Sequence, residues 1–378
     1  MINKRFCAIS LAFLLCACGK KSKSQSGGNS NKEQQKEGEH EPNQQANPAH
    51  QGDEVLNGKD KNGQNKPNGD NVNGKNGQNT PNGNKEIPKK QDKNFPTGLS
   101  NLGASCYLNS SVQQLYNIEP IRKVVLNGKF NDNDKLKALQ EMFKGMLSDS
   151  SFFDPDKLAY ELGYQGTQED ASVFLVELLD ILGEKNAEIK RMLTFSSETV
   201  YSKTCEHLSK SQSSEGILHL VINKDNLEDC LTENFSTEHL TGDNKMYCNI
   251  CKKNVDAERK EQLVSVPQTF IFALTRFNNQ GDKVNKKVSF PLDLKIKTEW
   301  CAEELSKNIP SYTLTGVIVH SGSCEGGHYW SYVKTGEKWY KCNDDTVSEA
   351  HMEDSLLKSL YGDGKKSDSA YILFYSKA

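Results

Sequence analysis

Residues 316–333 read GVIVHSGSCEGGHYWSYV, in which two apolar runs flank a turn rich in glycine and serine. Runs of Val, Ile, Tyr and Trp bounded by such residues are typical of paired strands. The two glycines before His328 allow close approach by a neighbouring group, because glycine has no side chain. Residues 338–345 read KWYKCNDD and predict the next strand, which ends at Asn343. We therefore expect His328 and Asn343 to be neighbours, although each residue also fits an ordinary turn.

Helix-like patterns precede this segment, and strand-like patterns surround it. Residues 106–117 read CYLNSSVQQLYN and place apolar side chains on one helical face. A second helix is predicted to start at Thr167, where Thr167 and Asp170 fit a capping box. A helical half followed by an antiparallel β half predicts an α+β fold with its active site at their junction. The strand-like runs are residues 216–222, 262–266, 269–276, 312–320, 329–334, 338–342 and 370–376.

Cys106 opens the first predicted helix, where unpaired amide groups and partial positive charge favour a thiolate. The loop before it, Asn101 to Ser105, is small and polar enough to present amide groups to a developing oxyanion. A lone cysteine at a helix start is also an ordinary packing residue, so this segment alone leaves both interpretations open. The order Cys, His, Asn along the chain is the one that papain-like cysteine proteases use.

Five ordered segments together resemble the ubiquitin-specific protease family (peptidase family C19) of deubiquitinases across residues 95–378. The resemblance implies a papain-like α+β fold with a helical thumb, a β palm and β fingers. It also implies a cysteine protease that hydrolyses the (iso)peptide bond after the C-terminal Gly-Gly of ubiquitin through a thioester. The segments are residues 98–115 (GLSNLGASCYLNSSVQQL), 168–180 (QEDASVFLVELLD), 274–294, 316–333 and 370–377.

The resemblance also implies a role for each matching residue of the site. Cys106 would be the nucleophile, and His328 would be its general base and then its general acid. Asn343 would orient the imidazole, with Asp344 assisting or substituting for it. Asn101 would donate a hydrogen bond to the oxyanion. No cofactor is expected for this chemistry.

Asp170 resembles the acid that holds the arginine-containing tail of ubiquitin, a contact that charge-assisted hydrogen bonds favour. Two other functions stay open on the sequence. One is a catalytically silent ubiquitin-binding module, and the other is a protease for another ubiquitin-like modifier.

A pair of cysteines, Cys248 and Cys251, has the CxxC spacing that in this family joins an earlier pair to hold structural zinc. The earlier pair is altered, because Leu208 stands where its second thiolate is expected. His207 lies one residue closer to Cys205. Cys205, His207, Cys248 and Cys251 therefore form a candidate structural zinc site, and a degenerate site without metal is the alternative.

The N-terminal part has a different composition. Residues 1–17 combine two basic residues with an apolar run that is too short to span a bilayer, and they resemble a bacterial lipoprotein signal peptide. Cleavage before Cys18 and lipidation of Cys18 are predicted, with an ordinary secretory signal as the alternative. Residues 18–94 are rich in Asn, Gly, Lys and Gln and predict a disordered linker.

The charge balance bears on the partners. Lys and Arg number 47 against 50 Asp and Glu, for a net charge of −3, so nucleic acid is not a predicted partner. We expect a monomer that binds ubiquitin and ubiquitinated proteins, which would belong to a eukaryotic host. We also expect an exported lipoprotein, anchored to a membrane through its lipid and exposed to or delivered into the host cell.

Overall fold

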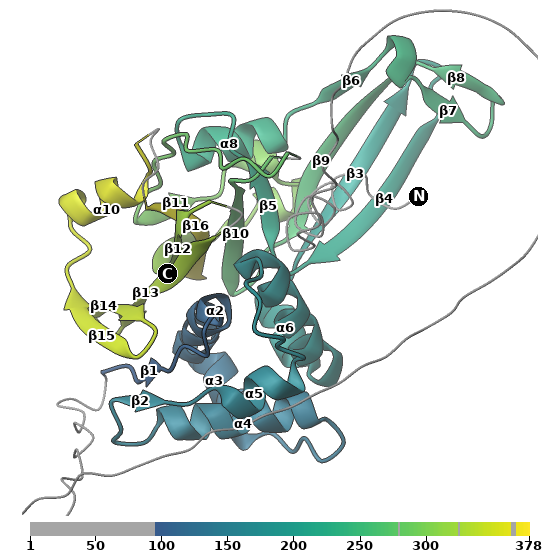
Figure 1. Cartoon of the computed structure of the whole chain (residues 1–378). Helices are drawn as coiled ribbons and strands as arrows, with labels where there is room; N and C mark the ends of the chain where they lie inside the picture. The colour runs from purple at the N-terminus through teal and green to yellow at the C-terminus, as the bar shows by residue number, and fades with distance from the viewer. Residues whose placement is uncertain (1–94, 279, 324–325, 364–367) are drawn as a thin grey trace, which may run out of the picture. The chain divides into compact units, whose positions relative to one another are not determined.

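The computed structural model describes residues 95–278, 280–323, 326–363 and 368–378 (Figure 1). The predicted signal peptide of residues 1–17, the lipidation site Cys18 and the linker of residues 18–94 lie outside the described residues. Within the described ranges, no helix has both the length and the apolar character needed to cross a membrane.

The described chain begins with helices and continues with strands, which confirms the expected α+β order. The first predicted helix is found at residues 106–117, with both ends as predicted. Two short strands, β1 (Gly98–Leu99) and β2 (Phe152–Phe153), pair in parallel within this half. The helices are α2 (Cys106–Asn117), α3 (Glu119–Asn127), α4 (Asp134–Met146), α5 (Asp156–Glu161), α6 (Ala171–Lys185) and α7 (Ala187–Leu193).

Helix α2 is buried along almost its whole length, although many of its side chains are polar. Buried amide groups need hydrogen-bond partners, and backbone carbonyl groups provide them here. Gln113 Nε2 donates to Thr97 O at 2.6 Å, and Gln114 Nε2 donates to Tyr332 O at 2.9 Å. These bonds connect α2 both to the segment before it and to the large sheet, so the helix is held from two sides.

The start of α6 differs from the prediction. The helix begins at Ala171 rather than Thr167, because Asp170 itself is the N-cap. Asp170 has extended backbone angles, and its Oδ1 accepts from the amides of Ser172 at 2.8 Å and Val173 at 3.0 Å. A side chain that caps the helix in this way replaces the predicted capping box.

The β half contains a large sheet with the strand order β15-β14-β13-β12-β16-β10-β5, and β11 also pairs with β12. All neighbours are antiparallel except β5 and β10. Six of the seven predicted strand runs lie in this sheet. Its strands are β5 (Leu218–Val221), β10 (Thr269–Thr275), β11 (Asp293–Lys295), β12 (Ser311–Gly322), β13 (Gly327–Thr335), β14 (Lys338–Asn343), β15 (Thr346–Ala350) and β16 (Ser369–Lys377).

Both faces of the large sheet are buried, which explains why its central strands read as continuous apolar runs. In β16, Ile372 and Phe374 join the core shared with the helices, whereas Leu373 and Tyr375 join the core on the other face. The register with β12 shifts at Tyr371, so Tyr371 and Ile372 both face the helical side. This β-bulge brings the hydroxyl group of Tyr371 to the start of α6.

A second sheet with the order β4-β3-β9-β6 extends away from the large sheet, and Figure 1 shows the β7–β8 hairpin at its far end. The seventh predicted strand, residues 262–266, is the end of the longer β9. The strands are β3 (Phe195–Lys203), β4 (Leu208–Glu215), β6 (Glu238–Leu240), β7 (Met246–Cys248), β8 (Lys253–Val255) and β9 (Ala257–Ser265). The remaining helices are α8 (Leu227–Asn234), η1 (Gly242–Asn244), η2 (Thr298–Trp300), α9 (Glu303–Ser306) and α10 (Asp354–Leu360).

Candidate active site

Cys106, His328 and Asn343 come from three elements that meet where α2 packs on the large sheet. Cys106 is the buried first residue of α2, His328 is the second residue of β13, and Asn343 ends β14. His328 Nε2 lies 2.6 Å from Asn343 Oδ1, and the ring lies close enough to Cys106 for that residue to raise the pKa of His328. Because an amide oxygen only accepts, Nε2 donates to Asn343 and Nδ1 is left to face Cys106.

The surroundings of His328 favour its protonated form. The neighbouring Cys106 contributes most to raising the pKa of His328 to about 9, and the hydrogen bond to Asn343 adds to this effect, while burial opposes it. The ring is therefore protonated at neutral pH. A protonated imidazole beside a thiol stabilises the thiolate, which is the nucleophilic form of cysteine.

Asp344 makes its main contacts with the helical half rather than with the imidazole. Its Oδ2 lies 3.8 Å from His328 Nε2 but accepts from Asn101 Nδ2 at 2.8 Å. Its Oδ1 accepts from Asn109 Nδ2 at 2.8 Å, and its backbone carbonyl accepts from Leu99 N at 2.8 Å. The carboxylate thus connects the β14–β15 turn to α2 and to the loop before α2.

The backbone amides of the loop before Cys106 already have hydrogen-bond acceptors, three within the loop and one in Tyr164. Asn101 Oδ1 accepts from the amides of Gly103 at 2.9 Å and Ser105 at 3.3 Å. The amide of Leu102 donates to Ser105 Oγ, and the amide of Ala104 donates to the Tyr164 hydroxyl group, both at 2.9 Å. The expectation that these loop amides face an oxyanion is therefore not met.

Other donors remain near the nucleophile. The first amides of a helix have no partner within the helix, so the amide of Cys106 itself is suited to an oxyanion. Asn101 Nδ2 uses one hydrogen for Asp344 and has a second one to offer. The predicted contribution of Asn101 to the oxyanion stays a prediction.

Asp170 is an interior residue. It is 3% exposed, and its carboxylate accepts from the Tyr371 hydroxyl group as well as from Ser172. The geometry therefore gives Asp170 the role of a helix cap that is bonded to the bulge of β16. The implied contact with a substrate tail stays a prediction, and the neighbouring Glu169 is the exposed acid at this position.

Three residues that contact the site were not singled out from the sequence. Tyr164 donates to Leu102 O at 3.1 Å and thereby fixes the loop before Cys106, and Asn109 binds Asp344. Gln168 lies between the Cys106 and His328 segments. Of the three, Asn109 and Gln168 had a usable signal, because each belongs to a segment that resembles a family motif.

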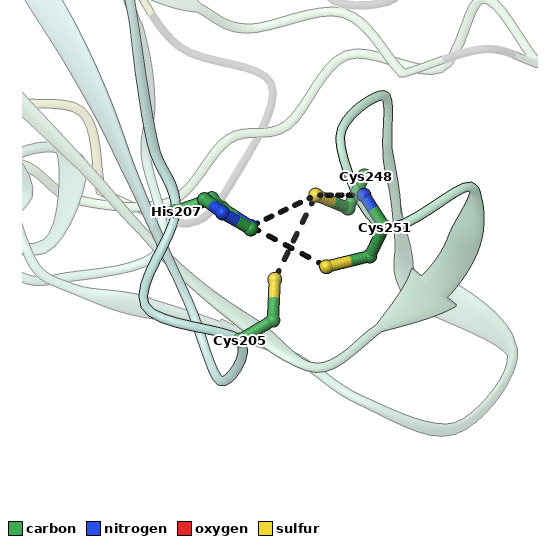
Figure 2. A group of neighbouring side chains, drawn as sticks. All are labelled: Cys205, His207, Cys248 and Cys251. Atoms are coloured by element: carbon green, nitrogen blue, oxygen red, sulfur yellow. Dashed lines mark hydrogen bonds between the residues drawn. The ribbon is translucent and has the colours of Figure 1, made fainter.

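Figure 2 shows the second predicted site, where Cys205, His207, Cys248 and Cys251 gather beside the β7–β8 hairpin. Their ligand atoms all lie within 4.8 Å of one another. The Cys205 and Cys248 sulfur atoms are 3.6 Å apart, and His207 Nδ1 lies 3.7 Å from Cys248 Sγ and 3.4 Å from Cys251 Sγ. Ligand atoms of a tetrahedral zinc ion lie roughly 3.4–3.8 Å apart. The residues thus fit zinc, and Leu208 is exposed outside the group.

The backbone around these residues supports a dedicated site. Among the described residues, the only non-glycine residues with positive φ are Glu206 (63°), Lys252 (55°) and Asp344 (52°). Glu206 separates Cys205 from His207, and Lys252 follows Cys251, so both turns of the cluster adopt a backbone that side chains disfavour. Such outliers concentrate at functional sites.

Comparison with known proteins agrees with this geometry. The model of the ubiquitin carboxyl-terminal hydrolase family matches residues 97–375, so the chain belongs to this family. The chain is 28% identical over 353 residues to ubiquitin carboxyl-terminal hydrolase 34 of Homo sapiens, covering 74% of this chain and 10% of the relative. It is 27% identical over 333 residues to hydrolase 25 of Arabidopsis thaliana, covering 77% and 49%. It is 32% identical over 307 residues to hydrolase 48 of Danio rerio, covering 71% and 28%.

The chain thus spans about half the length, or less, of these relatives. The expected papain-like α+β architecture is confirmed. Helices α2 to α7 form the thumb, the large sheet forms the palm, and the β4-β3-β9-β6 sheet with the β7–β8 hairpin forms the fingers.

Proposed function

We propose that this chain is a deubiquitinase, a thiol protease that hydrolyses the (iso)peptide bond after the C-terminal Gly-Gly of ubiquitin. The observation that carries the proposal is the arrangement of Asn343, His328 and Cys106, in which Asn343 bonds the His328 ring and Cys106 lies beside that ring. The relatives reported above are named ubiquitin carboxyl-terminal hydrolases, which supports ubiquitin as the substrate.

The reaction follows from the placement of a protonated imidazole beside a thiol. The Cys106 thiolate attacks the carbonyl carbon of the terminal glycine, and the resulting oxyanion is stabilised by donors near the start of α2. The His328 imidazolium gives its proton to the departing lysine amine as the carbon–nitrogen bond breaks, which leaves a thioester. Neutral His328 then takes a proton from water, which attacks the thioester. As the carbon–sulfur bond breaks, the ubiquitin carboxyl group is released, and the Cys106 thiolate is restored beside the His328 imidazolium.

A structural zinc ion in the fingers is part of the proposal. Cys205, His207, Cys248 and Cys251 would hold it, and four protein ligands leave no open position for a catalytic water molecule. Its contribution would be to fix the turn after β3 against the β7–β8 hairpin.

For the cellular setting, we propose a bacterial lipoprotein that carries its lipid on Cys18 and acts on ubiquitin conjugates of a host cell. The support is the composition of residues 1–17 and of the polar linker at residues 18–94. In this arrangement the linker would hold the catalytic domain away from the membrane.

The test of the activity compares wild type with Cys106→Ala on di-ubiquitin and on a fluorogenic ubiquitin amide. Wild type should cleave both substrates, and Cys106→Ala should bind ubiquitin without turnover. Binding without turnover by wild type would identify a silent ubiquitin-binding module. Neither binding nor turnover would reject ubiquitin as the substrate, and a panel of other ubiquitin-like modifiers would then identify the one that reacts.

A further inference from the structure

The side chain of Gln168 connects the two catalytic segments. Its Nε2 donates to the backbone carbonyl of Gly327 at 2.6 Å, and its Oε1 accepts from the Gly327 amide at 3.1 Å. Its Nε2 also lies 3.8 Å from Cys106 Sγ. One side chain thus binds both backbone groups of the residue before His328 and also contacts the nucleophile.

Gly327 is held on its other side as well. A Cβ atom on Gly327 would lie 2.3 Å from His320 Nε2 and 2.5 Å from the carbonyl oxygen of Ser321, so no side chain fits here. Gly327 also pairs with Gly322 across the β12–β13 hairpin. The peptide that leads into His328 therefore lies between a buried imidazole and the amide of Gln168, and it has little room to move.

Gln168 is itself placed by a rigid support. Two residues later, Asp170 caps α6 and accepts from the hydroxyl group of Tyr371 on β16. The short segment from Gln168 to α6 is therefore anchored at Asp170. A glutamine on such a support can hold a backbone in register, whereas one on a free loop would follow the motion of its partner.

We propose that Gln168 is a positioning residue that holds the Gly327 peptide and so keeps the His328 ring beside Cys106. The inference rests on the proposed thiol protease function. The positioning role is assigned to the two hydrogen bonds with Gly327, and the 3.8 Å contact of Nε2 with Cys106 Sγ is separate from it.

The test uses Gln168→Met, which has a similar length and shape but no hydrogen-bonding amide. The matched control is Gln140→Met, because Gln140 Nε2 also donates to backbone carbonyl groups, those of Val125, Leu126 and Gly128, within the helical half. For Gln168→Met we expect kcat on the fluorogenic ubiquitin amide to fall by about 10- to 100-fold with little change in KM, as for a misplaced catalytic group. Gln140→Met should keep the wild-type kcat.

A second readout does not depend on the substrate. The titration of the His328 ring, followed by NMR, should move from about 9 in the wild type toward its ordinary value in Gln168→Met. The titratable groups that face this ring are Cys106, Asp344 and His320. Burial lowers the pKa of His320 to about 3, so His320 stays neutral over the measured range.

Each other outcome decides against the proposal. A Gln168→Met protein with wild-type kcat and His328 titration would overturn it. A raised KM with both of these unchanged would make Gln168 a substrate-binding residue. Equal losses in Gln140→Met would show general destabilisation. Should Gln168→Met not fold, Gln168→Asn, which is one methylene too short for both bonds, is expected to show the same two changes. Wild type without turnover would reject the proposed function, while the NMR titration would still decide the role of Gln168.

Discussion

The side-chain oxygen of Asn343 lies 2.6 Å from Nε2 of His328 and so fixes which ring nitrogen faces the nucleophile. A neutral amide in this position orients the ring by accepting one hydrogen bond, without adding an ionic partner. The nearest carboxylate, that of Asp344, is 3.8 Å from the same nitrogen and is engaged by two asparagine amides. Asn343 thus orients the His328 ring, whereas the adjacent Asp344 supports the site through Asn101 and Asn109.

This division predicts different effects for the two positions. Asn343→Ala should lower kcat by about tenfold or more, because the ring loses its orienting bond. Asp344→Asn tolerates the positive φ but can accept only one of the two asparagine amides, so it should lower the free energy of unfolding by about 1–3 kcal/mol. Steady-state kinetics and urea unfolding measure both effects. A larger loss of kcat in a well-folded Asp344→Asn would instead make Asp344 the third catalytic residue.

The raised pKa of His328 predicts how activity depends on pH. The reaction needs the imidazolium as general acid, so kcat/KM should fall as pH rises through about 9. The same shift stabilises the fold: the contribution is fully present below the ordinary pKa of histidine, about 6.5, and is lost as pH rises through about 9. Cys106→Ala removes the largest cause and should move the NMR titration of His328 down. An unchanged titration in this variant would show that Cys106 is not the main partner of the ring.

The burial of Asp170 predicts a stability defect in Asp170→Ala. The variant loses the cap of α6, worth about 1 kcal/mol, and leaves the Tyr371 hydroxyl group without its acceptor, worth about 1–3 kcal/mol. Urea unfolding of Asp170→Ala should show a free energy of unfolding that is lower by the sum of the two contributions. Tyr371→Phe should lower the free energy of unfolding by less, because the cap of α6 remains. If Asp170 instead binds the ubiquitin tail, Asp170→Ala will raise KM while its unfolding free energy stays at the wild-type value.

The cluster in the fingers predicts one zinc ion per chain in purified protein, measurable by elemental analysis. Cys248→Ala should lose the metal and unfold at a lower temperature, since metal binding contributes to folding. His207→Cys offers a thiolate in place of the imidazole and should retain zinc. Folded wild-type protein that is free of metal after purification in zinc-containing buffer would count against the site.

Local pattern was sufficient for much of the fold. Helix α2 follows from a helical period of apolar residues, and six of the eight strands of the large sheet follow from apolar runs. Strands β11 and β15 were not predicted. The predicted start of α6 was wrong because the local sequence allows either Thr167 or Asp170 as the helix cap. Asp170 is also bonded by Tyr371, which lies 201 residues further along the chain and reaches Asp170 through a bulge. No local signal contains that contact.

Some residues of the site could likewise be predicted from the sequence, and others could not. Cys106, His328 and Asn343 could be found because their residue types and order carry chemistry. Tyr164 could not be found, because its hydroxyl group reaches the loop before Cys106 only after the helices have packed. In the fingers, spacing pointed to Leu208, and side-chain chemistry selected His207 instead, because imidazole is a zinc ligand. The positions of the four ligand atoms agree with that choice.

β16 is the last described strand along the sequence, yet it occupies the middle of the palm, between β12 and β10. Cys106, His328 and Asn343 all precede it. During translation, all three reactive residues are therefore synthesised before β16, the strand that joins β12 to β10. Proteolytic competence should therefore appear only once the chain up to Lys377 has been synthesised.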